Sequence, residues 1–371
     1  MKILLLGEYS NVHWTLALGL RKLGHKVTVI SNGDFWKNYP RDISLVRHNR
    51  PFDGTFYYLK LLSVLPRLRG YDIVQLINPM FLELKAERIF SVYHYLKSHN
   101  KRVVMGAFGM DYYWVSTCDS KHSPFRYSDF NMGEKLRYDD DANKERRDWL
   151  GTAKERLNKE MAETCDAIVA GLYEYWKCYE PHFPTKTTFI PYPIQMDNFP
   201  PRQTFYEQGK SIKLFIGISK KRSVYKGTDI MLKAAKDVQA KYPTHLDLLI
   251  ANGIPFEEYC QMMEGADLIA DQLYSYTPAM NALQAMSRGI ICIGGGEAEN
   301  YEIIHEDKLR PIVNVQPTYD SVFHELENLV LHPEKIASMQ HQSIEYIAKH
   351  HEYIHVAKQY EKLYNGLLSE N

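Results

Sequence analysis

Short apolar runs alternate with segments of helical periodicity along most of the chain, and this alternation restricts the possible folds more than any other feature. Residues 2–6 form a compact apolar run, residues 14–23 carry helix-spaced apolar residues, and residues 26–31 form a second run. Such a unit predicts two parallel strands joined by a right-handed crossover. Further strands are expected at 72–77, 102–107 and 167–170, and the clearest further helix at 81–98.

A second series of the same kind begins near residue 213, after a connector that contains four prolines between 191 and 201. Its expected strands are 214–218, 246–251, 266–271 and 290–293. Its expected helices are 228–242, 255–263 and 279–288, and the tail from about 321 is helical throughout. Continuous apolar strands between helices are typical of parallel sheets buried on both faces. We therefore predict an α/β fold with two Rossmann-like domains facing a central cleft.

The length agrees with this division, because 371 residues exceed what one hydrophobic core usually organises. We place the N-terminal domain at 1–200 and the C-terminal domain at 201–351, and expect a final helix at about 352–371 to pack back on the first domain. The 45 basic and 45 acidic side chains balance, so no overall positive field favours nucleic acid as a partner.

Five cysteines without zinc-site spacing indicate reduced packing thiols in a cytoplasmic protein. The N-terminus lacks the pattern of a signal peptide, and no apolar run approaches ~20 residues. We expect a cytoplasmic location, with the inner face of the cell membrane as an alternative.

Several stretches of the C-terminal half resemble retaining GT-B glycosyltransferases of the group 1, family 4-like type, which include sucrose-synthase-like and bacterial polysaccharide enzymes. They are the strand, basic loop and Lys-Gly helix start at 216–229, the turn at 253–259, the strand at 266–273, and the segment 278–289. The similarity covers 160–315 well and the first 110 residues loosely.

This resemblance implies transfer of a sugar from a nucleoside diphosphate sugar to a saccharide or lipid-linked saccharide acceptor. No metal or other cofactor is expected, since GT-B enzymes generally stabilise the departing diphosphate with positive charge and N–H groups. Arg222 and Lys226 are the cations placed to do so, with Lys226 as the first choice. The remaining nucleotide-sugar residues are expected to be Gly7, Gly253, Met280, Asn281 and Gln284.

Two positions depart from the pattern of the family. Its members usually carry two glutamates eight positions apart, and this chain has Tyr276 and Gln284 there. An amide oxygen at Gln284 can still accept a hydrogen bond from a ribose hydroxyl, but Tyr276 has no corresponding function. A non-catalytic sugar-nucleotide-binding subunit and a sugar-nucleotide epimerase therefore stay open as alternatives.

In the N-terminal half, the turn after the first strand has only one glycine, Gly7, so a nicotinamide or flavin dinucleotide is not indicated. Asp111 follows the strand at 102–107 and either orients an acceptor hydroxyl as a catalytic residue or caps a helix. The adjacent rings Tyr112, Tyr113 and Trp114 are candidates for stacking on acceptor sugars, with ordinary packing as the alternative.

Two further motifs have structural alternatives. The run Gly294-Gly295-Gly296, followed by Glu297 and Glu299, forms either a tight turn or a donor-sugar contact. The triplet 139–141 resembles a DxD metal signature, but it precedes a polar helix, and we interpret it as a helix cap.

Residues 35–70 combine seven basic and two acidic side chains with interleaved aromatic residues and leucines. Such a surface could rest on anionic lipid headgroups and meet a lipid-linked acceptor as a peripheral membrane contact. A core helix with a basic outer face is the alternative.

Overall fold

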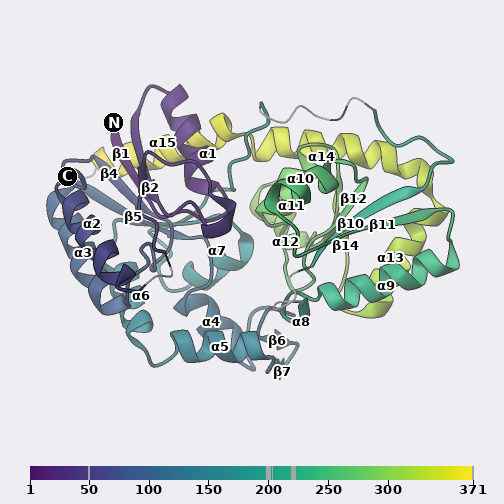
Figure 1. Cartoon of the computed structure of the whole chain (residues 1–371), viewed down its shortest axis with the longest axis horizontal. Coiled ribbons are helices and arrows are strands. Elements are labelled where there is room, and N and C mark those ends of the chain that lie inside the picture. Colours follow the sequence, from purple (N-terminus) through teal and green to yellow (C-terminus); the bar gives the residue numbers. More distant parts are fainter. Residues whose placement is uncertain (49–50, 198–201, 203, 219–222, 370–371) are drawn as a thin grey trace. The chain divides into compact units, whose positions relative to one another are not determined.

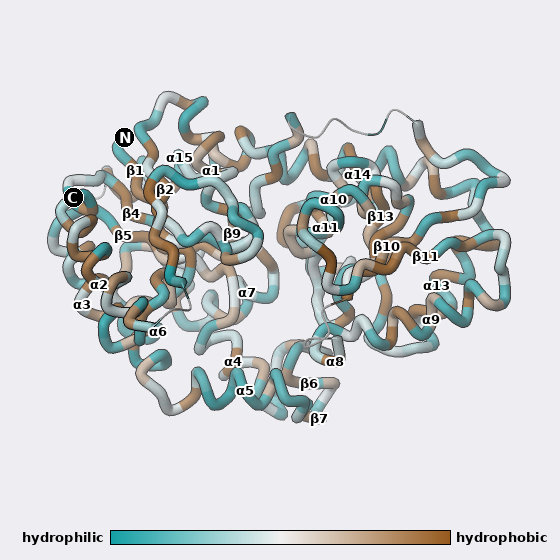
Figure 2. Tube along the Cα trace, in the orientation of Figure 1, coloured by the Kyte–Doolittle hydropathy of each residue, from teal (hydrophilic) through white to brown (hydrophobic). Residues whose placement is uncertain are grey.

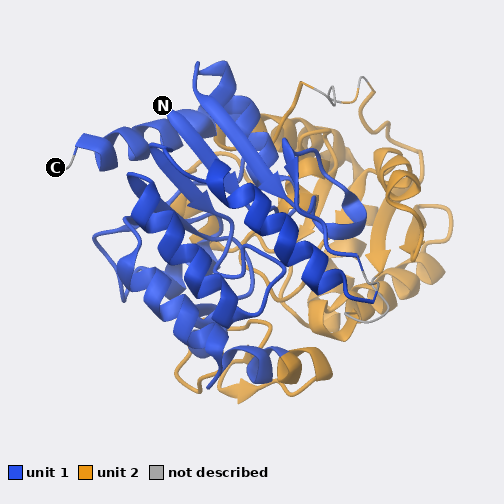
Figure 3. Ribbon diagram, turned by 60° about the vertical axis from the view of Figure 1, so that its left-hand side comes forward, with its two compact units in different colours: residues 1–117, 145–193, 353–371 blue, residues 118–144, 194–352 orange. Residues whose placement is uncertain are grey.

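The computed structural model describes residues 1–48, 51–197, 202, 204–218 and 223–369, which form two compact α/β units (Figure 1). Unit 1 comprises Met1–Thr117, Glu145–Pro193 and Tyr353–Asn371, and unit 2 comprises Cys118–Lys144 and Ile194–Glu352 (Figure 3). Residues 118–144 thus belong to unit 2, although the expected division at residue 200 assigned them to the first domain. Their side chains pack on the loops of unit 2, which sequence separation alone does not reveal.

Unit 1 is built on a seven-stranded parallel sheet of order β3-β2-β1-β4-β5-β8-β9. Its strands are β1 (Lys2–Leu6), β2 (Lys26–Ser31), β3 (Ile43–Ser44), β4 (Ile73–Leu76), β5 (Arg102–Ala107), β8 (Ala167–Ala170) and β9 (Thr187–Phe189). In register, Leu4 lies between Thr28 and Val74. The strand order reverses direction between β1 and β4, which makes their carboxyl ends a topological switch point.

The helices of unit 1 are α1 (Val12–Lys22), α2 (Asp53–Val64), α3 (Ala86–His99), α4 (Tyr112–Cys118), α6 (Ala153–Thr164), α7 (Tyr173–Tyr179) and α15 (Tyr353–Ser369), with short 3-10 turns at η1 (Phe35–Lys37) and η2 (Leu65–Arg67). Of the three with expected bounds, α1 and α15 begin and end within about two residues of them. The main difference is α3, predicted from residue 81. It starts at Ala86 because Lys85 is extended and forms its N-cap.

The final helix, α15, packs on α1 inside unit 1. Gly19 of α1 allows this close approach, since a Cβ there would lie 2.6 Å from the Tyr353 carbonyl oxygen. A buried polar chain then connects α15 to the first strand. The Tyr364 hydroxyl donates to Gln75 Oε1 at 2.6 Å, and the Gln75 amide donates to His13 Nε2 at 3.3 Å. His13 Nδ1 donates in turn to the Gly7 carbonyl at 2.8 Å.

Unit 2 contains a five-stranded parallel sheet of order β11-β10-β12-β13-β14. Its strands are β10 (Ile212–Ile218), β11 (Leu246–Asn252), β12 (Leu268–Ala270), β13 (Ile291–Gly294) and β14 (Val313–Asn314), and a small antiparallel pair is formed by β6 (Asn131–Met132) and β7 (Lys135–Leu136). Figure 2 shows β10 and β13 among the most hydrophobic stretches of the trace. The order reverses between β10 and β12, so a second switch point lies at their carboxyl ends.

Helices pack against both faces of this sheet, as its apolar strands require. They are α8 (Ser223–Lys226), α9 (Thr228–Lys241), α10 (Phe256–Glu264), α11 (Met280–Met286), α12 (Ala298–Ile303), α13 (Tyr319–Leu331) and α14 (Ile336–His350), with the 3-10 turn η3 (Pro333–Lys335). Helices α9 and α13 pack together over one core that includes Leu214, Leu268 and Ile291. The alternate strand residues Phe215, Ile269 and Cys292 are equally buried. Helix α5 (Asp140–Trp149) includes the point in the sequence at which unit 2 gives way to unit 1. Asp139 caps it by accepting from Ala142 N at 3.0 Å, which confirms the capping interpretation.

We predict that Tyr364→Phe lowers the free energy of unfolding by about 1–2 kcal/mol, because it leaves the buried Gln75 Oε1 without its donor. Thermal unfolding of the single variants and of the double variant with Gln75→Leu measures this contribution. The cost of Tyr364→Phe should shrink in the Gln75→Leu background. Equal costs in both backgrounds would show that the hydroxyl contributes nothing through Gln75.

Candidate functional site

The switch point of unit 2 brings a lysine and an aspartate together. Lys226 ends α8, which follows β10, and Asp271 directly follows β12. The two loops are joined where Leu273 N donates to the Lys226 carbonyl oxygen at 3.0 Å. The half-buried Lys226 therefore stands beside the carboxyl ends of both central strands, where parallel sheets bind their ligands.

Asp271 lies close enough to Lys226 for the lysine charge to act on the pKa of its carboxyl group. Burial raises the pKa of Asp271, while the positive charge of Lys226 and a hydrogen bond from Ala279 N at 3.2 Å oppose that rise. Asp271 thus links the lysine loop to the start of α11. The sequence reasoning missed Asp271, although its place directly after a buried strand was a signal for it.

Arg222, the other expected cation, lies outside the described residues. The remaining expected nucleotide-sugar residues of unit 2 follow strands at the same edge of the sheet. Gly253 follows β11 in the left-handed region at φ 69°, with no atom within 4 Å of the place of a Cβ. Met280, Asn281 and Gln284 are half-buried on α11, and Asn281 Nδ2 donates to the Tyr259 hydroxyl at 2.9 Å.

The glycine run after β13 has a packing reason. A Cβ on Gly295 would lie 2.2 Å from the Ser275 carbonyl oxygen, and one on Gly296 would lie 2.8 Å from Ile312 Cγ2. The loop after β13 therefore approaches the loop after β12 at Gly295, and the residues at β14 at Gly296, too closely for a side chain at either position. This geometry favours the turn over the donor-sugar contact as the reason for the run.

Tyr276 is fully buried and anchors the segment 118–144. Its hydroxyl accepts from Arg126 N at 2.6 Å, and its ring lies 4.9 Å from that of Tyr127 and 5.6 Å from that of Phe125. The Arg126 guanidinium lies 4.8 Å from the Tyr276 ring centroid. At the position where the family that the sequence resembles usually has a glutamate, this chain therefore has a residue that packs against segment 118–144.

Glu297 completes this contact. Its carboxylate accepts from the Tyr127 hydroxyl at 2.6 Å, from Gln316 Nε2 at 2.7 Å and from Arg126 at 2.8 Å. Burial alone would raise the pKa of Glu297, but these donors lower it below its usual value. The carboxylate is therefore charged and held within the protein.

Arg137 connects the same segment to the lysine loop. Its guanidinium donates to the Val224 carbonyl at 2.9 Å and lies 3.5 Å from the ring centroid of Tyr274. Val224 belongs to α8, and Tyr274 belongs to the loop after Asp271. One side chain thus fixes the two loops that carry Lys226 and Asp271, and its position in the sequence did not suggest this function.

In unit 1, the switch point between β1 and β4 contains Gly7. Its φ of 88° and the 2.3 Å that would separate a Cβ from Ile77 Cγ2 both exclude a side chain. A cavity of about 80 Å³ lies beside it, lined by Glu8, Tyr9 and Asn32 among others. A larger groove of about 820 Å³ shares Phe35, Met80 and Glu83 with this cavity.

Glu8 and His13 are ionisable residues of this region that the sequence reasoning missed. Glu8 accepts from His13 N at 3.1 Å and Trp14 N at 2.9 Å, and so caps α1. Burial nevertheless raises the pKa of Glu8 to about 8. Burial lowers the pKa of His13 to about 3, so its ring is neutral and relays hydrogen bonds between Gly7 and Gln75.

Asp111 is fully buried and acts as a helix cap. Oδ1 accepts from Trp114 N at 2.9 Å, and Oδ2 accepts from the Tyr179 hydroxyl at 2.6 Å. Burial raises its pKa to about 6. Of the two roles considered for Asp111, this geometry favours the cap over the orientation of an acceptor.

The three rings after Asp111 pack mainly inside unit 1. Tyr113 lies against Tyr179, with ring centroids 4.6 Å apart, and Trp114 lies against Tyr175 at 5.5 Å. Both are buried, and Tyr112 is half-buried with Lys159 over its ring at 4.6 Å. Packing, the alternative stated for these rings, accounts for Tyr113 and Trp114.

Several solved structures share this architecture. Sucrose-phosphate synthase from Thermosynechococcus elongatus matches with a TM-score of 0.65 and 12% identity over 100% of both chains. The chain has the GT-B fold. HepE from Anabaena in complex with UDP-glucose matches with a TM-score of 0.60 and 12% identity over 99% of this chain and 100% of that one.

A third GT-B match bears a different description. A UDP-N-acetylglucosamine 2-epimerase from Listeria monocytogenes matches with a TM-score of 0.58 and 10% identity, over 100% of this chain and 97% of that one. No protein-family model and no curated sequence matches the chain. The fold expected from the residue patterns is confirmed, and these identities show the GT-B fold alone.

We predict that the stability of the wild type falls with rising pH relative to Glu8→Gln. The unfolded carboxyl loses its proton near 4.5, whereas the folded one keeps it to about 8, so the unfolded state binds fewer protons between these values. The stabilisation from protonated Glu8 is complete below 4.5 and is lost as pH rises through 8. Between pH 5.5 and 8 the unfolding midpoint of the wild type should fall about 3 °C or more further than that of the variant.

The exposed Glu87→Gln serves as the matched control for this measurement and should follow the wild type. Parallel pH profiles for the wild type and Glu8→Gln would contradict the raised pKa.

We predict that Tyr276→Glu, which introduces the glutamate usual in the family that the sequence resembles, destabilises the protein by about 3–5 kcal/mol. It places a carboxylate in a buried position beside Glu297. The control Tyr276→Phe loses only the acceptor for Arg126 N and should cost about 1–2 kcal/mol. Thermal unfolding compares the two variants, and a Tyr276→Glu protein as stable as the wild type would refute the anchoring role.

Proposed function

We propose that this protein is a glycosyltransferase that moves a sugar from a nucleoside diphosphate sugar to a saccharide or lipid-linked saccharide acceptor. The observation that carries this proposal is the position of Lys226 at the switch point of unit 2, beside the carboxyl ends of β10 and β12. Structures of the same fold include one in complex with UDP-glucose, so UDP is the first nucleotide to test.

The chemistry follows from the charge that the reaction creates. As the bond between the anomeric carbon and the diphosphate breaks, the leaving group gains negative charge, and the acceptor hydroxyl forms the new bond and loses its proton. A fixed cation lowers the barrier most where that charge develops. Lys226, held by the Leu273 N bond to its carbonyl and facing Asp271, supplies such a cation without a metal ion.

The half-buried side chains on α11 suit the nucleotide. Gln284 is half-buried, and its side-chain oxygen can accept a hydrogen bond from a ribose hydroxyl. The hydrogen bond from Asn281 to the Tyr259 hydroxyl fixes the orientation of the Asn281 side chain. Because the sequence resembles retaining GT-B glycosyltransferases, we also propose that the sugar is transferred with retention of its anomeric configuration. We further propose that the protein acts in the cytoplasm, at the inner face of a membrane. Among the described helices, none is both long and apolar enough to cross a bilayer.

A sugar-nucleotide epimerase is the second candidate, favoured by the matching structure described as a 2-epimerase. The products separate the two. A transferase releases free nucleoside diphosphate when acceptor is present, whereas an epimerase returns an intact nucleotide sugar with one inverted carbon. A non-catalytic subunit would bind the nucleotide sugar, release no nucleoside diphosphate and invert no carbon.

We predict that UDP or UDP-glucose raises the unfolding midpoint of the protein, and that Lys226→Ala reduces turnover about 100-fold or more. Lys236→Ala, an exposed lysine on α9, is the matched control and should keep full activity. Thermal shift against UDP, GDP, ADP and CMP sugars selects the donor, and release of the nucleotide is then followed.

Absence of a thermal shift with every nucleotide of the panel would contradict sugar-nucleotide binding. Full activity in a folded Lys226→Ala variant would remove the lysine from the mechanism.

A further inference from the structure

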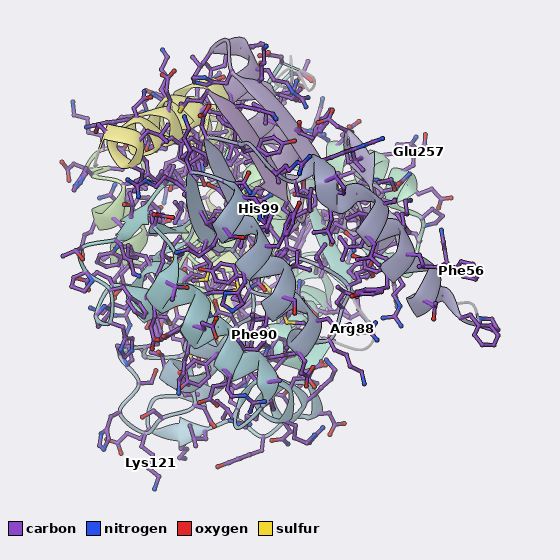
Figure 4. The ribbon with its side chains drawn as sticks, turned by 90° about the vertical axis from the view of Figure 1, so that its left-hand side faces the viewer. Phe56, Arg88, Phe90, His99, Lys121 and Glu257 are labelled. Atoms are coloured by element: carbon purple, nitrogen blue, oxygen red, sulfur yellow. The ribbon has the colours of Figure 1, made fainter. Side chains whose placement is uncertain are left out.

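Helix α2 of unit 1 is apolar on two faces, and only one of them is covered. Tyr57, Leu61 and Val64 are buried against the unit. On the other side lies a row of exposed apolar residues that we call the α2 outer face: Phe52 (81% exposed), Phe56 (66%), Leu59 (56%) and Leu62 (43%). Their spacing follows one stripe of an α-helix. Figure 4 shows Phe56 projecting away from the ribbon of unit 1.

A second exposed aromatic pair lies close to this helix. Phe35 and Trp36 of η1 are 63% and 66% exposed, and Phe35 lines the same small cavity as Tyr57 of α2. Phe35 also lines the larger groove near the β1 and β4 loops. Of these exposed apolar residues, Phe35 therefore adjoins both the groove and the small cavity that reaches α2.

The charges on this helix and on the turn after it are positive. Lys60, Arg67 and Arg69 are exposed, and the one acid between residues 52 and 70 is Asp53. The Asp53 side chain is only 13% exposed and lies 4.0 Å from Arg47. The exposed charged side chains of α2, η2 and the turn after η2 are therefore all positive.

We propose that the α2 outer face, with Phe35 and Trp36, docks on the surface of an anionic lipid bilayer. Rings and leucines of this kind enter the boundary between headgroups and acyl chains, while neighbouring lysine and arginine side chains pair with anionic headgroups. At 12 residues, α2 is about 18 Å long, so it lies in the plane of the interface and does not span it.

The charge pattern favours a membrane over a second copy of this chain. In a symmetric dimer the same patch meets itself, which would place Lys60, Arg67 and Arg69 of two copies together without exposed acids from this segment to neutralise them. An anionic bilayer instead supplies the opposite charge. A core helix with a basic outer face is the alternative for this segment; the exposed Phe56, Leu59 and Leu62 of α2 favour the apolar docking surface over it.

This inference also names the class of acceptor, and the acceptor assignment rests on the proposed glycosyltransferase function. The groove of about 820 Å³ is lined in part by Phe35, which belongs to the docking surface, so docking would bring the Phe35 edge of the groove to the bilayer. The acceptor class that fits this arrangement is a saccharide carried on a membrane lipid. Docking itself needs no nucleotide.

Co-sedimentation of the full chain with vesicles tests the docking surface. We expect binding to phosphatidylglycerol–phosphatidylcholine vesicles at low salt, weaker binding at high salt, and little binding to pure phosphatidylcholine. Phe56→Ser with Leu59→Ser should reduce the bound fraction about 10-fold or more. Lys60→Glu with Arg67→Glu should reduce it on anionic vesicles in particular.

The matched control is Tyr138→Ser with Leu331→Ser, which removes an aromatic ring and a leucine that are 67% and 54% exposed in unit 2. It should bind vesicles as the wild type does. No binding of the wild type to anionic vesicles, or an equal loss in the control, would overturn the proposal. A concentration-dependent dimer that Phe56→Ser with Leu59→Ser abolishes would assign the face to a second copy instead.

Failure here is distinguishable from failure of the proposed function, because nucleotide-induced thermal shifts report on unit 2. Vesicle binding without any nucleotide shift would leave the docking surface standing and refute the acceptor assignment. Unchanged unfolding midpoints in the surface variants would show that their lost binding is not a loss of folding.

Discussion

Parallel strand pairing is the constraint on which the rest of this structure depends. Parallel neighbours need a crossover connection, and that connection places the carboxyl ends of all strands at one edge of each sheet. Where the strand order reverses, the two loops diverge and leave room for side chains. In unit 2 this puts Lys226 and Asp271, 45 residues apart in the sequence, in electrostatic contact. The same rule places the loops of β1 and β4 around Gly7 in unit 1.

The segment 118–144 changes what the loops of unit 2 can do. In the sequence, Tyr276 is a departure from the pattern of the family it resembles, and Glu297 is an acid after a glycine run. In the structure, Arg126 and Tyr127 contact both of these residues. Arg137 of the same segment holds the carbonyl of Val224, two residues before Lys226. Tyr276, at the position where the family that the sequence resembles usually has a glutamate, therefore has a structural role in holding this segment. Its presence does not by itself indicate a site that has lost its function.

Buried polar groups in unit 1 serve connection more than chemistry. Asp111, expected as a catalytic candidate, has both carboxylate oxygens occupied inside the protein, and His13 is held neutral by burial while it bridges Gly7 and Gln75. Through Tyr364 this chain reaches α15, which lies almost 300 residues later in the sequence. A buried network of this kind stabilises a fold when its members have their partners, and here it adds to the packing of α15 on α1.

The sequence by itself determined the class of fold, because the periodicity of apolar residues distinguishes strands from helices and the resulting alternation allows little other than parallel sheets. The resemblance of its C-terminal segments to a known family also singled out Lys226, between a strand and Gly227, and the departure at Tyr276. Only the tertiary structure decided that residues 118–144 belong to unit 2, that Asp271 faces Lys226, and that the outer face of α2 is apolar. Each of these depends on contacts between residues far apart in the chain or on which face of an element is covered. Local patterning carries neither kind of information, because both arise only when the packed elements exclude water from one side and leave the other exposed.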